Sequence, residues 1–272
     1  IAAAKEEGIV SIGLHHPVAN CLDYAQLLAE KYHLTHCNIV PVYRNESALD
    51  SVTFGCYQLM ARYLQGDKPT VVGIGSGLTL KKTIKRIDFD SHNTRCVALI
   101  SAMNEHGQCN YYDDVPLLLA RKIQGKYYQW PAPRYAQSSE EHEMWCSNRL
   151  FRNVCAVADA ADVIFVGIGA LGRQSPIFKD GFIDEAQLEE LTQRGGVGEI
   201  LGRFIDADGN VIDSQINRFI TSYDIRQSQC PRIAAACGED KRPAILAALK
   251  GGWVNGLVTD EQTARWLLTR QG

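Results

Sequence analysis

The chain has 272 residues, of which 46% are hydrophobic and 22% are charged. These values are typical of a globular protein with a substantial core, large enough for one α/β domain. The net charge of −3 excludes a generally basic chain, so a surface for nucleic acid has to be local or lie outside these residues. No apolar run has the length of a membrane span, and no signal peptide is recognisable. Nine cysteines without a CxxC pair indicate free thiols and a cytoplasmic protein.

The first residues are typical of the end of a module that precedes the main fold. Residues 1–8 predict the end of a helix with Gly8 in the capping position, and a short strand follows at residues 9–12. We expect residues 1–12 to be the remnant of that module, residues 13–20 to be a linker, and residues 21–272 to form the main domain.

From residue 21 onward, helical and strand patterns alternate. Helices are predicted at 21–32, 47–64, 78–87, 113–123, 140–160, 241–249 and 261–269, and strands at 38–43, 70–74, 96–100, 126–130, 162–167, 232–236 and 256–260. This alternation predicts an α/β, Rossmann-like fold with a mostly parallel sheet and helices on both faces. The Asp208-Gly209 pair between residues 202–206 and 209–213 also predicts a small β-hairpin insertion.

A glycine turn follows the predicted strand at 70–74. Gly75 and Gly77 allow a tight turn and a close approach to a ligand, while the helix behind them offers free N–H groups. Ser76 and Thr79 add hydroxyl donors, which makes this an anion site suited to phosphate. The alternative is a plain strand-to-helix turn with no ligand. A dinucleotide fingerprint would have a further glycine where Leu80 stands, and the P-loop pattern is missing, so we expect no nucleotide cofactor.

A second buried strand, at 162–167, also ends in glycines. Parallel strands place their carboxyl ends at one edge of the sheet, where open α/β sheets bind ligands. The pair of glycine turns therefore indicates a ligand site more strongly than either turn alone. The alternative is that Gly167 only allows close helix packing.

Two charged residues lie in positions that suit a ligand at the same edge. Lys241 stands between a buried strand and a helix, where its charge could bind phosphate, although a solvated lysine is the simpler interpretation. Asp206 ends a strand and could accept hydrogen bonds from sugar hydroxyls, or it could only open the turn that follows. His33 and His36 have no partner ligands at metal-site spacing, so we expect no metal.

Taken together, these segments resemble the C-terminal effector-binding domain of SorC-family (SorC/DeoR-type) sugar-responsive transcriptional regulators. The matching segments are residues 75–79, 162–170, 195–202, 204–209, 238–252 and 257–260. The resemblance runs from about residue 21 to the end and implies a fold similar to that of sugar-phosphate isomerases and deaminases. It also implies that residues 1–12 are the end of a helix-turn-helix module.

The resemblance implies roles for particular residues. The phosphate of the effector would be bound by Gly75, Ser76, Gly77, Leu78, Thr79, Gly169, Ala170, Leu171 and Lys241. Asp206 and Gln137 would bind sugar hydroxyls, and the loop from residue 130 to Gln137 would line the pocket. The chain departs from the family pattern at residues 100–104 and at Cys237, so the identity of the sugar stays open.

Two functions are compatible with these features of the sequence. The first is a regulator that binds a sugar phosphate or sugar, binds operator DNA through the upstream module, and forms a homo-oligomer, usually a tetramer in this family. The second is a sugar-phosphate isomerase or deaminase, since a shared fold does not fix function. Asp206 and Glu199 are candidate bases for such an enzyme, but no histidine or second carboxylate motif clearly converges with them. The sequence therefore favours a regulator without catalytic residues or cofactor.

Overall fold

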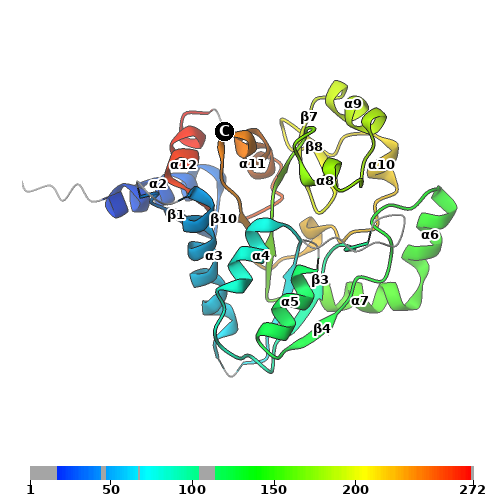
Figure 1. The fold of residues 1–272 in the computed structure, drawn as a ribbon, viewed down its shortest axis with the longest axis horizontal. Coiled ribbons are helices and arrows are strands. Elements are labelled where there is room, and N and C mark those ends of the chain that lie inside the picture. Colours follow the sequence, from blue (N-terminus) through cyan, green and yellow to red (C-terminus); the bar gives the residue numbers. More distant parts are fainter. Residues whose placement is uncertain (1–16, 44–46, 67, 104–113, 271–272) are drawn as a thin grey trace, which may run out of the picture.

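The computed structural model describes residues 17–43, 47–66, 68–103 and 114–270. Its main sheet has seven strands in the order β1-β10-β9-β5-β2-β3-β4, and every neighbouring pair is parallel (Figure 1). The strands are β1 (His36–Val40), β2 (Val71–Ile74), β3 (Arg95–Ala98), β4 (Lys126–Tyr128), β5 (Val163–Val166), β9 (Arg232–Ala235) and β10 (Gly256–Asp260). The predicted α/β fold with a mostly parallel sheet is confirmed.

Helices cover both faces of this sheet. One face packs against α3 (Ala48–Leu64), α4 (Leu78–Lys85) and α5 (Val115–Lys122), and the other against α2 (Pro17–Tyr32), α7 (Arg149–Asp159), α11 (Arg242–Lys250) and α12 (Glu261–Leu268). The strands between them are apolar because both sides are buried; every residue of β2 and β5 is buried. No helix within the described ranges is long and apolar enough to cross a membrane.

Two helix boundaries differ from the sequence prediction. Helix α2 begins at Pro17, inside the predicted linker, because proline is well suited to the first turn of a helix. The predicted helix at 140–160 is divided into α6 (Ser139–Ser147) and α7, because Asn148 adopts an extended conformation and its side chain accepts a hydrogen bond from the Leu150 N–H at 2.8 Å. Residues 1–12 and the first half of the predicted linker, residues 13–16, lie outside the described residues.

A smaller three-stranded sheet lies beside the main one, in the order β6 (Gly169–Ala170), β7 (Gly196–Ile200) and β8 (Arg203–Asp206). The helices α8 (Pro176–Lys179), α9 (Glu185–Gln193) and α10 (Gln215–Arg218) belong to this part of the fold, and a separate core lies beneath them. The predicted hairpin insertion is confirmed, but its strands are β7 and β8. Residues 209–213 contribute only one isolated bridge, between Val211 and Ile205.

The turn between β7 and β8 consists of Leu201 and Gly202, with φ of 51° and 80°. A two-residue turn with positive φ at both positions matches the twist of an antiparallel hairpin. Leucine pays a conformational cost there, and the cost is offset because the Leu201 side chain is buried.

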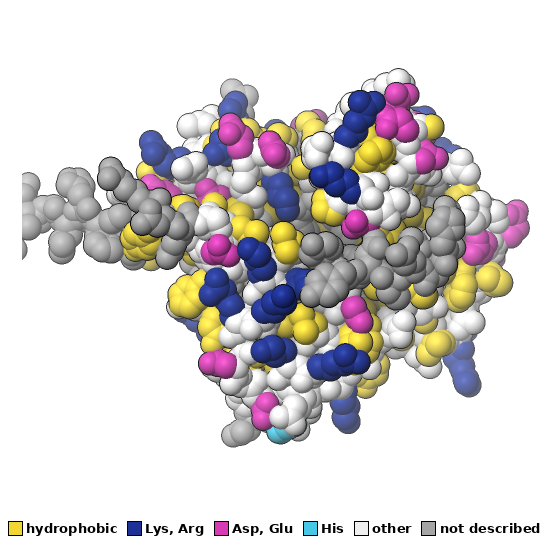
Figure 2. All heavy atoms as spheres, in the orientation of Figure 1, with side chains coloured by type: hydrophobic (Ala, Val, Ile, Leu, Met, Phe, Trp, Pro, Cys, Tyr) yellow, Lys and Arg dark blue, Asp and Glu magenta, His cyan; other side chains and the backbone are white. Residues whose placement is uncertain are grey.

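Basic side chains gather over α4 and α5 (Figure 2). Both helices have basic last turns, with Lys82 and Lys85 in α4 and Arg121 and Lys122 in α5. Positive charge at a helix C-terminus is stabilised by the helix dipole, and the Lys122 ammonium donates to the Ile87 carbonyl at 3.2 Å just beyond α4. These charges are therefore explained by the helix ends and are not evidence for a nucleic-acid surface.

Candidate functional site

Three neighbouring strands of the main sheet end in turns that meet at its carboxyl edge. The strands are β9, β5 and β2, and their turns are residues 236–241, 167–171 and 75–79. The Gly75 N–H donates to the Phe165 carbonyl at 2.9 Å, and β6 lies in contact with the short 3₁₀ helix η2 (Glu239–Lys241). We call these three turns, together with Glu199, the strand-end site. Its position is the usual place for a ligand in an open α/β sheet.

The turn after β2 presents its backbone to open space. Gly77 precedes α4 with a φ of 114°, a conformation that disfavours any side chain, and a Cβ placed on it would meet no atom within 4 Å. The first turn of α4 therefore directs its free N–H groups toward an open position, with Thr79 buried beneath. The structure thus places Gly75, Ser76, Gly77, Leu78 and Thr79 together, as the sequence predicts.

The turn after β5 continues into β6, which pairs with β7. Gly169 is opposite Glu199, and a Cβ on Gly169 would lie 2.2 Å from Glu199 Oε1. The absence of a side chain at position 169 therefore leaves room for the Glu199 carboxylate. Ala170 is opposite Gly198, and the side chain of the next residue, Leu171, packs against Gly196.

The turn after β9 carries Lys241. Gly238, with a φ of 104°, begins η2, and Lys241 ends it where α11 starts. The Lys241 side chain is half-buried, and this burial lowers its pKa against the opposing effects of Cys237 and Glu199. A partly desolvated ammonium attracts an anionic ligand more strongly than a fully solvated one does.

Glu199 is the residue of this site that the sequence did not assign to ligand binding. Its carboxylate accepts the Gly202 N–H at 2.7 Å. Burial raises the pKa of Glu199, while that hydrogen bond and the charges of Arg134 and Lys241 lower it. Lys241 can bind a phosphate while Glu199 accepts hydrogen bonds from hydroxyl groups, so the pair suits a ligand that has both. From the sequence Glu199 was a candidate base for an enzyme but not a ligand-binding residue, because the pairing of its glycine-rich segment with β6 depends on the tertiary fold.

Asp206 and Gln137 lie away from the strand-end site. The Asp206 carboxylate accepts the N–H groups of Asp208 and Asn210 at 3.0 and 2.9 Å, within the turn that follows β8. That turn packs against the C-terminal end of α11, whereas Lys241 stands at the N-terminal end. Gln137 is exposed and lines a separate cavity of about 450 Å³. The turn-forming alternative for Asp206 therefore accounts for its contacts, and the hydroxyl-binding roles of both residues stay predictions.

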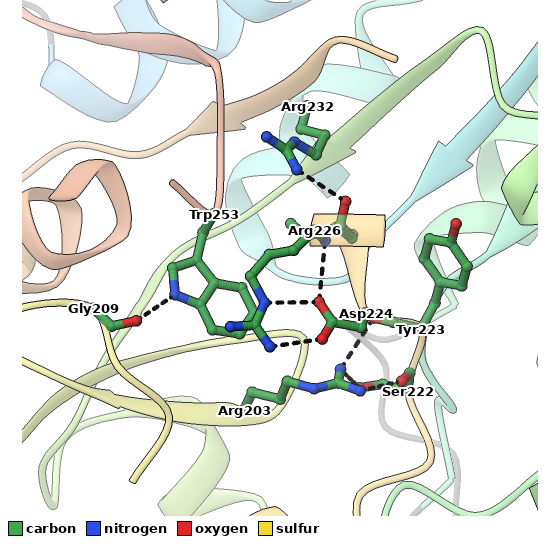
Figure 3. Close-up of polar contacts among 9 residues, drawn as sticks. Arg203, Gly209, Ser222, Tyr223, Asp224, Arg226, Arg232 and Trp253 are labelled. Atoms are coloured by element: carbon green, nitrogen blue, oxygen red, sulfur yellow. Dashed lines mark hydrogen bonds and ion pairs between the residues drawn. The ribbon is translucent and has the colours of Figure 1, made fainter. Parts of the chain in front are cut away.

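A polar network supports the hairpin that carries Glu199 (Figure 3). Arg203, at the start of β8, donates to the Ser222 hydroxyl at 2.7 Å and to the Tyr223 carbonyl at 3.0 Å. The Arg226 guanidinium makes an ion pair with Asp224 and lies 4.2 Å from the centroid of the Trp253 ring. This network joins the small sheet to residues 222–226, which precede β9 of the main sheet, and so helps to fix the orientation of the hairpin.

No group of three or more histidine, cysteine, aspartate or glutamate side chains in the described part of the chain is arranged to hold a metal ion. His36 shares a 2.7 Å hydrogen bond with the Tyr63 hydroxyl. That contact gives His36 a structural role.

Comparison with known proteins places the chain in a family. Residues 16–269 match the family model described as "Putative sugar-binding domain". The chain is 30% identical over 271 residues to the erythritol catabolism regulatory protein EryD of Brucella abortus. That alignment covers 98% of this chain and 85% of EryD. The chain is 28% identical over 274 residues to the transcriptional regulator LsrR of Escherichia coli K12, covering 97% and 82%.

Solved structures show the same fold. The full-length sorbitol operon regulator SorC from Klebsiella pneumoniae superposes with a TM-score of 0.82 at 22% identity, covering 99% of this chain and 88% of that one. A domain of a possible sugar-binding transcriptional regulator from Arthrobacter aurescens gives 0.80 at 20% identity, covering 96% and 100%.

The chain therefore belongs to the family of sugar-binding domains. Its curated relatives EryD and LsrR are regulatory proteins, so a transcriptional regulator is favoured over the isomerase or deaminase alternative.

Proposed function

We propose that the effector of this domain is a phosphorylated sugar or polyol whose phosphate binds at the strand-end site. The observation that carries the proposal is the convergence of three elements at one sheet edge: the open first turn of α4, the Gly169 turn, and the half-buried Lys241. Backbone N–H groups at a helix start and a nearby ammonium are the usual donors to a phosphate.

Glu199 supports a sugar rather than a bare phosphate as the ligand. A carboxylate beside an anion site repels inorganic phosphate, so its presence is explained when the same ligand offers hydroxyl donors. The names of the relatives are compatible with this chemistry, since one refers to erythritol catabolism and another to the sorbitol operon.

Binding of operator DNA and assembly are further parts of the proposal. The relatives are transcriptional regulators, which supports a helix-turn-helix module ending near residue 12 and a linker that gives way to α2 at Pro17. The effector would shift the balance between subunit arrangements of a homo-oligomer, a tetramer by resemblance to the family. Sedimentation of the chain with and without effector tests the assembly.

Calorimetry with matched variants tests the phosphate site. We expect a cognate sugar phosphate to bind the native chain, and Lys241→Ala and Gly77→Val each to weaken it at least about tenfold. Lys250→Ala is the control for lysine, because Lys250 stands at the other end of α11. Gly195→Val is the control for glycine, because Gly195 also has a positive φ, 81°, and no atom within 4 Å of an added Cβ. Unchanged affinity for the sugar phosphate in both site variants, with their folds intact, would contradict the proposal.

A further inference from the structure

A cavity of about 450 Å³ lies between residues 133–137 and the helices α9 and α10. These helices, α8 and the three-stranded sheet form the part of the fold that we call the small lobe. The size of the cavity lies within the range of sites that bind small molecules. None of the glycines of the strand-end site lines it, and neither does Lys241 or Glu199. We call it the glutamine cavity, after Gln137, Gln187 and Gln215 in its lining.

The walls of the glutamine cavity are joined by backbone hydrogen bonds. Tyr135 forms an antiparallel bridge with Ile220. The Ala136 N–H donates to the Phe219 carbonyl at 2.9 Å, and the Thr221 N–H donates to the Arg134 carbonyl at 3.1 Å. The loop that carries Gln137 is therefore held against the segment that carries Phe219 by backbone hydrogen bonds.

The lining combines neutral amides with aromatic rings. Gln137 and Gln215 are exposed, and Gln187 uses its carbonyl oxygen to accept the Asp184 N–H at 2.9 Å, which leaves its NH₂ group as a donor. The half-buried Phe219 ring supplies an apolar surface, whereas Phe182 is buried and its ring lies against the Arg134 guanidinium. Amides both donate and accept hydrogen bonds, as hydroxyl groups do, and an aromatic face suits the C–H side of a sugar or polyol.

The charges of the lining disfavour a phosphate. Asp184 and Glu190 contribute two carboxylates, and Arg134 contributes the one guanidinium. The Arg134 guanidinium lies 3.4 Å from the centroid of the Phe182 ring and donates to the Ser101 carbonyl at 3.1 Å. The Glu190 carboxylate is paired with the Arg194 guanidinium at 2.9 Å, so the described lining residues offer no excess of positive charge, in contrast to the strand-end site with Lys241 and the start of α4.

We infer that the glutamine cavity is a second ligand site, which binds an uncharged polyhydroxylated compound, a free sugar or polyol, independently of the strand-end site. The inference does not depend on the proposed phosphate effector. It gives this domain separate positions for a neutral sugar and for a phosphorylated one.

Saturation-transfer NMR on the chain with three neutral probes, erythritol, sorbitol and glucose, tests this inference. At least one probe should bind, and Lys241→Ala should leave its affinity unchanged. Inorganic phosphate, added as a competitor, should not displace it. Gln215→Leu and Gln137→Leu should each weaken binding about tenfold, since each removes a hydrogen-bonding group from the lining. Gln193→Leu, an exposed amide on α9 outside the cavity, is the matched control and should have no effect.

Three results would overturn the inference. The first is that none of the probes binds. The second is that binding is lost in Lys241→Ala, which would assign neutral sugars to the strand-end site. The third is that the Gln215 and Gln137 variants bind the probe as tightly as the native chain does. The phosphate proposal is tested separately with a sugar phosphate, so either can fail alone.

Discussion

The Glu199 carboxylate occupies the position that a side chain on Gly169 would need, since a Cβ there would lie 2.2 Å from Glu199 Oε1. The two residues are opposite each other on β6 and β7. Gly169, in the turn after β5, and the Glu199 carboxylate are thus packed against each other, so the position of one limits the position of the other.

Gly169→Ala should displace Glu199 rather than the backbone, because the clash involves the far end of a flexible side chain. The displaced carboxylate would lose its hydrogen bond from the Gly202 N–H, at a cost of about 1 kcal/mol in unfolding free energy. Affinity for a sugar phosphate should fall about tenfold, while affinity for inorganic phosphate should change less. Calorimetry with both ligands checks this, and an equal loss for both would assign the effect to the turn after β5 and not to Glu199.

Glu199→Gln should stabilise the chain near neutral pH. Burial raises the pKa of Glu199, so between the usual glutamate value and the folded value the folded chain holds a proton that the unfolded chain has released. The stability of the native chain therefore falls as pH rises through this window. Urea unfolding should show the variant more stable at about pH 7, with the difference vanishing below about pH 4. A difference that grows toward low pH would contradict the assignment.

Asp206→Ala tests whether that carboxylate serves the turn or the ligand. Loss of its hydrogen bonds to the Asp208 and Asn210 N–H groups should lower the unfolding free energy by about 2 kcal/mol, with little effect on effector affinity. Unfolding and calorimetry on the same preparation separate the two roles. A large loss of affinity at unchanged stability would assign Asp206 to the sugar hydroxyls.

Trp253→Phe should destabilise the chain without affecting the site. The Trp253 side chain is 1% exposed, and its N–H donates to the Gly209 carbonyl at 2.7 Å. Phenylalanine leaves that carbonyl without its donor and leaves a small cavity, at a cost of about 2–3 kcal/mol. Trp266→Phe is the control, because Trp266 is half-buried, and it should cost less. Weaker effector binding in the Trp253 variant would show that the network in Figure 3 extends to the ligand.

Most of the main sheet could be predicted from the sequence because buried parallel strands are short apolar runs. The apolar runs of β2, β5, β9 and β10 are of this kind. Gly77 predicted the turn after β2, and Lys241 was expected between β9 and the helix that follows it. The order of the strands could not be predicted, because the sequence shows no pairing partners. It is this order that brings the turns of β9, β5 and β2 together.

The small lobe was harder to predict for two physical reasons. Strand β7 contains Gly196 and Gly198, whose missing side chains allow close contact with Leu171 and Ala244, so it lacks the alternating apolar pattern of a strand. Its partner β8 is then reached through a turn with leucine at positive φ, which no turn rule anticipates. The Asp208-Gly209 signal was correct as a turn, but Val211 alone pairs after it.

The structure of the chain with a bound sugar phosphate tests the central claim most directly. We predict that the phosphate lies within hydrogen-bonding distance of the backbone N–H groups at the start of α4 and of Lys241 Nζ, with at least one hydroxyl group on the Glu199 carboxylate. A phosphate bound in any other place, the glutamine cavity included, would contradict the account.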